Sequence, residues 1–152
     1  MGITNGEARD LIADYFRTFP HVHAYMEQAK QLAREKGYAE TIFHRRRYLP
    51  DITSRNNTVR GFAERNAINA PIQGSEADII KVAMIRIHRR FAEEGIRSKM
   101  ILQVHDELNF SVYPEEKALV ERIVVEEMEH AYTLSVPLVA DAGWGRNWLE
   151  AH

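Results

Sequence analysis

Three consecutive titratable residues, His105, Asp106 and Glu107, interrupt a stretch of sequence that is otherwise typical of a β-strand. Apolar and polar residues nearly alternate across residues 100–112, as they do in a strand with one buried face. Asp106 breaks this alternation because it falls on the apolar side of the pattern. The other residues of that side are Leu102, Val104, Leu108, Phe110 and Val112.

A reversal of the chain at His105-Asp106 would resolve the conflict, although no glycine is present to favour a tight turn. It would divide the stretch into two paired strands and lift the carboxylates of Asp106 and Glu107 to an exposed tip. Mg²⁺ is commonly held by one or two carboxylates together with waters and phosphate oxygens. The sequence therefore predicts a β-hairpin with a candidate metal site at its turn.

Two other interpretations of the triplet remain open. For the three residues alone, an exposed acidic turn that binds nothing is the simpler interpretation. A metal-dependent phosphohydrolase would use the His-Asp pair, but such a site needs further metal ligands. The available histidines, His21, His23 and His130, form no convincing set.

Composition places the chain among globular proteins. Its 152 residues suffice for one domain with a hydrophobic core, and 45% of them are hydrophobic and 28% charged.

The absence of cysteine excludes disulfides and thiolate metal sites, and no apolar run is long enough to span a membrane. The net charge of -2 argues against a generally basic surface. However, arginines gather in residues 44–65 and glutamates in residues 113–129, so a local basic surface could bind a polyanion.

The remaining pattern predicts an α+β fold in which helices pack on a small antiparallel sheet. A helix capped by Thr4 or Asn5 should end at Pro20, where a second helix begins and runs to Gly37. Residues 38–50 suit a hairpin that turns near His44. The other expected elements are a helix over 59–70 that stops at Pro71, a helix from about Gly74 to Glu94, a helix after Pro114, and a short strand in 136–143.

Four blocks of sequence follow one another along the chain: GYAETIFHRRRYLPDI, AERNAINAPIQGSEADIIKVAM, LQVHDEL and VPLVADAGWGRNWLEAH. In order and spacing they closely resemble the C-terminal part of bacterial family A DNA polymerases, the DNA polymerase I family. The resemblance covers essentially the whole chain. It implies that residues 1–37 are helices from the end of the fingers subdomain and that residues 38–152 are part of the palm. The hairpin near 100–112 corresponds to motif C of that family.

The resemblance implies a template-directed DNA polymerase that extends a primer 3′ end by two-metal phosphoryl transfer. Asp106 resembles one of the two aspartates that bridge the catalytic Mg²⁺ ions. Glu107 is similar to a nearby supporting carboxylate, and His105 to a residue near the primer terminus. Phage-type RNA polymerases generally have Ser after the His-Asp pair, so Glu107 favours the DNA enzyme.

The resemblance also implies a DNA-binding surface, in which Arg65, Asn69 and Gln73 contact the minor groove of the primer-template duplex. The first two residues are four apart and so share one helix face, whereas the third follows the expected break at Pro71. A helix cap and surface network is the alternative. The same resemblance assigns phosphate contacts or salt bridges to a run of arginines, for which a charged strand edge is the alternative. These are Arg45, Arg46 and Arg47.

Some of the family's pattern is altered or missing. His44 stands where Gly is common, Glu76 where Ala is common, and Ser111 where an acidic residue is often found. The family's second metal aspartate lies in a DYSQIELR-like strand, which does not occur in the chain. We therefore expect the chain to be the last part of a longer polymerase, to be inactive alone, and to self-associate through an exposed sheet edge.

Three classes of function are thus compared: a part of a DNA polymerase used in replication or repair, a non-catalytic nucleic-acid-binding module, and a metal-dependent phosphohydrolase. The resemblance favours the first. It implies primer-template DNA and deoxynucleotides as partners, Mg²⁺ as cofactor, and a bacterial cytoplasmic protein associated with the nucleoid.

Overall fold

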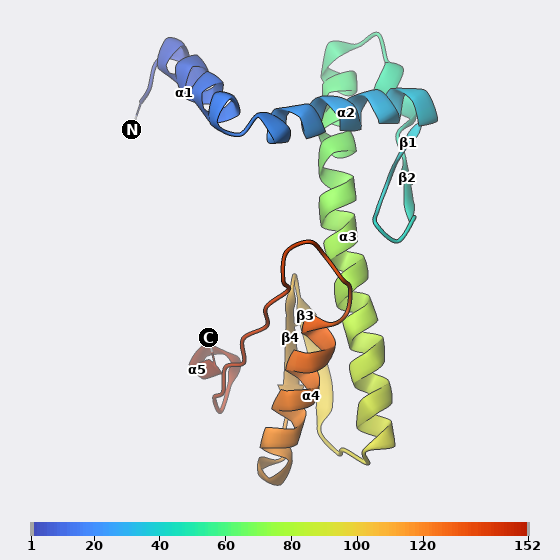
Figure 1. Ribbon diagram of the computed structural model, residues 1–152, viewed down its shortest axis with the longest axis vertical. Helices are drawn as coiled ribbons and strands as arrows, with labels where there is room; N and C mark the ends of the chain where they lie inside the picture. Colours follow the sequence, from blue (N-terminus) through green and yellow to red (C-terminus); the bar gives the residue numbers. More distant parts are fainter. Residues whose placement is uncertain (1, 152) are drawn as a thin grey trace. The chain divides into compact units, whose positions relative to one another are not determined.

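The computed structural model describes residues 2–151, which divide into two compact units (Figure 1). The first unit ends at Ser75 and the second begins at Glu76. The α+β class expected from the sequence is confirmed, but the described strands form two separate antiparallel pairs, β1-β2 and β3-β4, in place of one small sheet. No helix among the described residues is both long and apolar enough to cross a bilayer.

The first unit opens with two helices whose ends lie where the sequence predicts them. Helix α1 (Asn5–Thr18) begins with a capping box, in which Thr4 Oγ1 accepts from the Glu7 backbone N–H and the Glu7 carboxylate accepts from the Thr4 N–H. Helix α2 (Pro20–Lys36) starts at its proline and ends at Gly37, whose φ is 77°. Glycine adopts this left-handed conformation without steric cost.

A short hairpin follows the two helices and turns at the predicted histidine. Strand β1 (Tyr38–Glu40) pairs antiparallel with β2 (Arg46–Tyr48), and the connecting loop includes His44 with a φ of 64°. Histidine is one of the few non-glycine residues that adopt this conformation relatively often. The chain therefore makes the reversal with His44 in a conformation that glycine adopts most easily.

Helix α3 (Asn57–Glu93) contradicts the predicted helix break, because it continues through Pro71. A proline inside a helix removes one N–H donor and crowds a carbonyl of the preceding turn, at a cost of about 3 kcal/mol. Here the flanking residues Ala67 and Ala70 are buried in the core of the first unit. In addition, the Tyr25 hydroxyl donates to the Ile68 carbonyl at 2.9 Å. Tertiary packing thus overrides the local signal.

The first half of α3 also meets the β1–β2 hairpin at Gly74. A Cβ on this residue would lie 2.7 Å from Cγ2 of Thr41, so only glycine allows the two segments to approach this closely. Two hydrogen bonds complete the contact: Arg45 Nη2 donates to the Gly74 carbonyl at 3.0 Å, and the Ile42 N–H donates to Ser75 Oγ at 3.0 Å. The contact fixes the hairpin on the helix.

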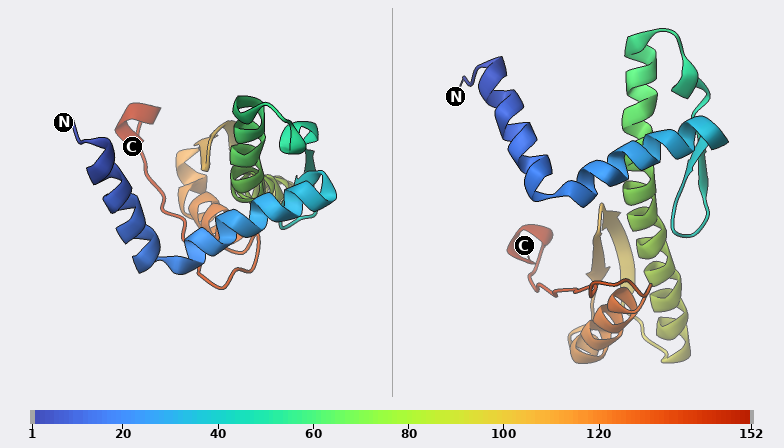
Figure 2. Two further views of the ribbon diagram at one scale, coloured as in Figure 1. Left: turned by 90° about the horizontal axis from the view of Figure 1, so that it is seen from above. Right: turned by 45° about the horizontal axis from the view of Figure 1, so that its top comes forward.

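The second unit packs a hairpin and a helix against the C-terminal half of α3 (Figure 2). Its elements are strands β3 (Lys99–Val104) and β4 (Glu107–Ser111), the 3-10 turn η2 (Pro114–Glu116), and helices α4 (Lys117–Glu129) and α5 (Trp148–Ala151). Residues 136–143, predicted as a strand, are irregular because they have no strand partner within the described part of the chain. The buried residues of its main core cluster are Ala83, Ile87, Phe91, Val120, Ile123 and Ala131.

Glu116 connects η2 to the segment before β3 through hydrogen bonds. Its carboxylate accepts from the backbone N–H groups of Arg97 and Ser98 at 3.0 and 2.9 Å, and from the Ser98 hydroxyl at 2.5 Å. The Ser98 hydroxyl and then the Arg97 N–H are the main causes that lower the pKa of Glu116 to about 2. The stabilisation from these hydrogen bonds of the ionised Glu116 carboxylate is therefore fully present above the ordinary glutamate pKa. It is lost only as the pH falls towards 2.

We expect Gly74→Ala to destabilise the first unit by about 1–3 kcal/mol, because the added methyl group collides with Thr41. Gly61→Ala, in the same helix, is the matched control, since its Cβ would have an ordinary contact of 3.7 Å with Arg65 Nη1. This control should gain up to about 1 kcal/mol from helix propensity. Urea or thermal unfolding of both variants measures the difference, and equal stabilisation of the two would contradict the packing described.

Candidate active site

The candidate site is built on the turn between β3 and β4, which lies where the sequence predicts it. Val104 pairs with Glu107, so His105 and Asp106 alone form the loop. His105 has a φ of 53°, and a positive φ at the first loop residue is common to the two-residue turns that favour β-hairpins. The side chain of Gln103 reinforces the turn, because its Nε2 donates to the His105 carbonyl at 2.6 Å.

The two-residue turn changes which apolar side chains face the core. Leu102 pairs with Asn109, so it lies on the outer face and is 48% exposed, whereas Leu108 and Phe110 pack on the core. Leu102 and Val104 therefore lie on the opposite face from Leu108, unlike in a continuous strand. An irregularity between Met100 and Leu102 then returns Met100 to the core face, opposite Phe110.

The two carboxylates of the turn differ in their surroundings. Asp106 is exposed, and no hydrogen bond or ion pair with another residue in 2–151 engages it. Glu107 is half-buried, and its Oε1 accepts from Asn109 Nδ2 at 2.9 Å and from the indole Nε1–H of Trp148 at 2.7 Å. One carboxylate is thus open to a ligand, and the other is held in place by neutral donors.

These side chains fit part of a Mg²⁺ site. Two adjacent carboxylates supply hard oxygen ligands, and Mg²⁺ usually completes its shell with waters and substrate phosphate oxygens. Within the described residues, no group of three or more His, Cys, Asp or Glu side chains could hold a metal. No third His, Cys, Asp or Glu side chain of the described residues therefore joins Asp106 and Glu107.

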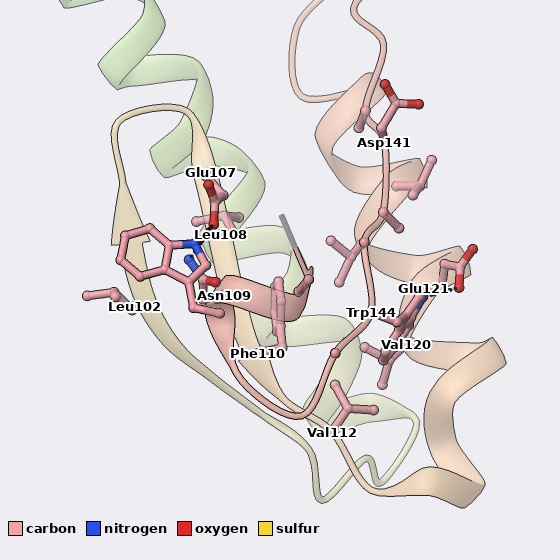
Figure 3. Close-up of a pocket in the computed structure, with 18 of the residues that line it drawn as sticks. Leu102, Glu107, Leu108, Asn109, Phe110, Val112, Val120, Glu121, Asp141 and Trp144 are labelled. Atoms are coloured by element: carbon pink, nitrogen blue, oxygen red, sulfur yellow. Dashed lines mark hydrogen bonds between the residues drawn. The ribbon is translucent and has the colours of Figure 1, made fainter.

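A hollow of about 840 Å³ lies beside the hairpin within the second unit. Its walls come from β4, α4 and the segment 139–151, and its rim includes Asp106 and Glu107. Figure 3 shows Glu107 and Asn109 on one side of the hollow and Glu121 with Trp144 on the other. Trp144 donates its indole N–H to Glu121 at 2.8 Å, so both tryptophans of the chain bond a carboxylate.

The residues predicted to contact DNA bases lie in the first unit, on α3. Because the helix continues through Pro71, Arg65, Asn69 and Gln73 follow one another at intervals of four residues and share one exposed face. The expectation that Gln73 lies beyond a break is wrong. Phe62 and Ile72 are also exposed on this face. The face therefore combines polar donors with apolar surface.

The three consecutive arginines have different environments. Arg45 donates to the Gly74 carbonyl, and Arg46 Nε donates to Glu40 Oε2 at 3.1 Å while its guanidinium lies 4.5 Å from the centre of the Tyr38 ring. Both therefore stabilise the hairpin and its contact with α3. Arg47 is exposed and has no hydrogen bond or ion pair with any other described residue.

Sequence reasoning missed the residues that hold Glu107 and the hairpin in place. Trp148 lies 41 residues from Glu107, and no spacing rule connects the two. Asn109 carried a weak signal, because residues two apart on a strand point to the same face. Gly74 also carried one, since a glycine inside a helix commonly marks close packing.

Three comparisons relate the chain to known proteins. The model of the family described as DNA polymerase family A matches residues 1–150. Proteins named DNA polymerase I from Streptococcus pneumoniae and from Bacillus caldotenax are 50% and 52% identical over 99% of this chain. A solved structure of the POL domain of Pol1 from M. smegmatis, in complex with DNA primer-template and dNTP, is 48% identical and has a TM-score of 0.96 over 98% of the chain.

The match extends over only part of each relative. The chain spans 17% of the length of both DNA polymerase I relatives and 26% of the polymerase-domain structure. Over that part, however, about half of the residues are identical, and the fold matches that of the Pol1 domain over 98% of the chain. The chain therefore belongs to DNA polymerase family A.

Proposed function

We propose that this chain is the motif C portion of the palm, preceded by the end of the fingers in residues 1–37, of a template-directed DNA polymerase. The parent enzyme adds deoxynucleotides to a primer 3′ end in replication or repair. The observation that carries the proposal is the exposed Asp106 carboxylate, which has no partner among the described residues, at the turn of a two-residue hairpin. The end-to-end match to DNA polymerase I supports it.

In this proposal Asp106 holds Mg²⁺, and Glu107 contributes negative charge from its fixed position beside it. Two bound metal ions would activate the primer 3′ hydroxyl and stabilise the departing phosphate oxygens. A second aspartate, of the kind found in the family's motif A, completes the pair of ligands and is not among these 152 residues. His105 lies at the turn, next to the position proposed for the primer terminus.

The exposed face of α3 is proposed to contact the duplex. Arg65, Asn69 and Gln73 offer hydrogen-bond donors, and the minor groove presents similar acceptors for every correct base pair. Donors on this face can therefore sense pairing geometry without reading sequence. The related Pol1 structure was solved with primer-template and dNTP, which supports these partners for the parent enzyme.

Among the consecutive arginines, we assign the phosphate contact to Arg47. Arg45 and Arg46 already bond groups within the first unit, so releasing them for DNA would cost those contacts. Arg47 loses no such contact, and a phosphate would gain a full ionic partner.

The proposal is tested by primer extension in a full-length family A polymerase that carries this sequence as its corresponding segment. Asp106→Asn should lower kcat by about 10²–10³-fold, because metal stabilisation of the reacting oxygens is worth several kcal/mol. The 152-residue chain alone should extend no primer, because it lacks the second aspartate.

Each alternative predicts a different result. Full activity of the Asp106→Asn polymerase would favour a non-catalytic nucleic-acid-binding module. Hydrolysis of nucleotides or phosphoesters by the 152-residue chain alone would favour a phosphohydrolase. Primer extension by that chain would contradict the proposed division of the two metal ligands.

Arg47→Ala in the same full-length polymerase should weaken primer-template binding equally for all sequences. The slope of log K against log salt concentration should decrease in magnitude by about 1, as expected for one lost phosphate contact. Arg46→Ala is the matched control, because it removes the same charge from a side chain bonded to Glu40. Identical salt slopes for Arg47→Ala and the unaltered enzyme, measured by fluorescence anisotropy, would refute the assignment.

A further inference from the structure

The C-terminal segment of the second unit reaches back to the hairpin that carries Asp106. Its short helix α5 begins with Trp148, whose indole Nε1–H donates to Glu107 Oε1 at 2.7 Å. Asn109 donates to the same oxygen at 2.9 Å. Glu107 therefore receives one donor from its own strand and one from a segment about forty residues later in the chain.

Two features hold α5 in this position. Asn147 and Glu150 form a reciprocal cap, in which the Glu150 N–H donates to Asn147 Oδ1 at 3.1 Å and Asn147 Nδ2 donates to Glu150 Oε1 at 3.1 Å. The helix also lies directly against the glycines that precede it. A Cβ on Gly143 would be 2.0 Å from the Ala151 carbonyl oxygen, and one on Gly145 would be 2.6 Å from the Ala151 nitrogen.

A second tryptophan attaches the start of this segment to α4. Trp144 donates its indole N–H to Glu121 at 2.8 Å, and Lys117 Nζ lies 4.5 Å from the centre of the Trp144 ring. The segment from Trp144 to Ala151 is thus fixed at one end to a core helix and at the other to the candidate catalytic strand. An indole donor on a rigid segment can set the direction of a carboxylate more firmly than a mobile side chain could.

We propose that Trp148 is a positioning residue of the polymerase site, which holds Glu107 in one orientation beside Asp106. This inference rests on the proposed function, because it assigns Glu107 a supporting part in the metal site. Adjacent carboxylates repel each other when both are ionised, so a released Glu107 would change its distance from Asp106 and from any cation held there. The amide of Asn109 and the indole of Trp148 are uncharged, so these two hydrogen bonds orient the carboxylate without cancelling the negative charge that a cation requires.

The hydrogen bond itself is tested by NMR of the 152-residue chain labelled with ¹⁵N-tryptophan, which should give two indole N–H resonances. Glu107→Ala removes the acceptor, so it should move the Trp148 resonance and speed its exchange with water, leaving Trp144 unaffected. Glu121→Ala is the matched control and should do the reverse. A Trp148 resonance that does not respond to Glu107→Ala would overturn the proposal, whatever the chain does in a polymerase assay.

The positioning part is tested by kinetics in the full-length polymerase that carries this sequence. Trp148→Phe keeps a large aromatic ring and removes the donor, so kcat should fall about tenfold with little change in the KM for dNTP, as for other residues that support metal ligands. Trp144→Phe should have a much smaller effect. Gly143→Ala, which displaces α5, should reproduce the loss seen with Trp148→Phe.

A double-mutant cycle separates positioning from general packing. If Trp148 acts through Glu107, Trp148→Phe should cause no further loss in a Glu107→Ala background, where the acceptor is gone. Full additivity of the two losses, or wild-type kcat in Trp148→Phe, would overturn the inference while leaving the proposed function intact. Failure of the proposed function would appear separately, as undiminished activity of Asp106→Asn.

Discussion

The reversal of the chain at His105-Asp106 is the constraint on which the candidate site depends. Because the loop contains only two residues, it fixes the pairing of Val104 with Glu107 and so decides which side chains face the core. It places Asp106 at the tip, where nothing in the described part of the chain engages its carboxylate. It also turns Glu107 to the outer face, within reach of Asn109 and Trp148. Adjacent residues of like chemistry thereby acquire different environments: one is open, and the other is anchored.

A second constraint acts in the first unit, where packing keeps α3 continuous through Pro71. The continuous helix places Arg65, Asn69 and Gln73 on one exposed face, whereas a break would have turned Gln73 away from the other two. Gly74 then lets the β1–β2 hairpin approach the helix, and Arg45 is bonded there. In both units, the side chains available to a ligand are those that do not already bond other residues of the unit.

Local chemistry explains what the sequence could predict. Pro20 and Gly37 restrict the backbone directly, and the break in alternation at Asp106 is visible in the residues themselves, so these ends and turns were correctly predicted. Pro71 was misjudged because its local penalty is outweighed by burial of Ala67 and Ala70, which depends on distant residues. The different environments of Arg45, Arg46 and Arg47, and the bond from Trp148 to Glu107, likewise depend on contacts that no short pattern encodes. The family resemblance supplied candidate site residues, and the structure supplied their surroundings.

The claim that Asp106 binds the catalytic metal is tested most directly by changing the metal preference of the enzyme. The chain has no cysteine, so Asp106→Cys introduces its only thiol. A thiolate binds Mg²⁺ poorly and softer cations well. In a full-length polymerase carrying this sequence, we expect Asp106→Cys to be inactive with Mg²⁺ and to regain primer extension with Mn²⁺ or Cd²⁺. Full activity of Asp106→Cys with Mg²⁺ would contradict metal binding by Asp106. So would a result in which neither softer cation restores Asp106→Cys but one of them restores Glu107→Cys.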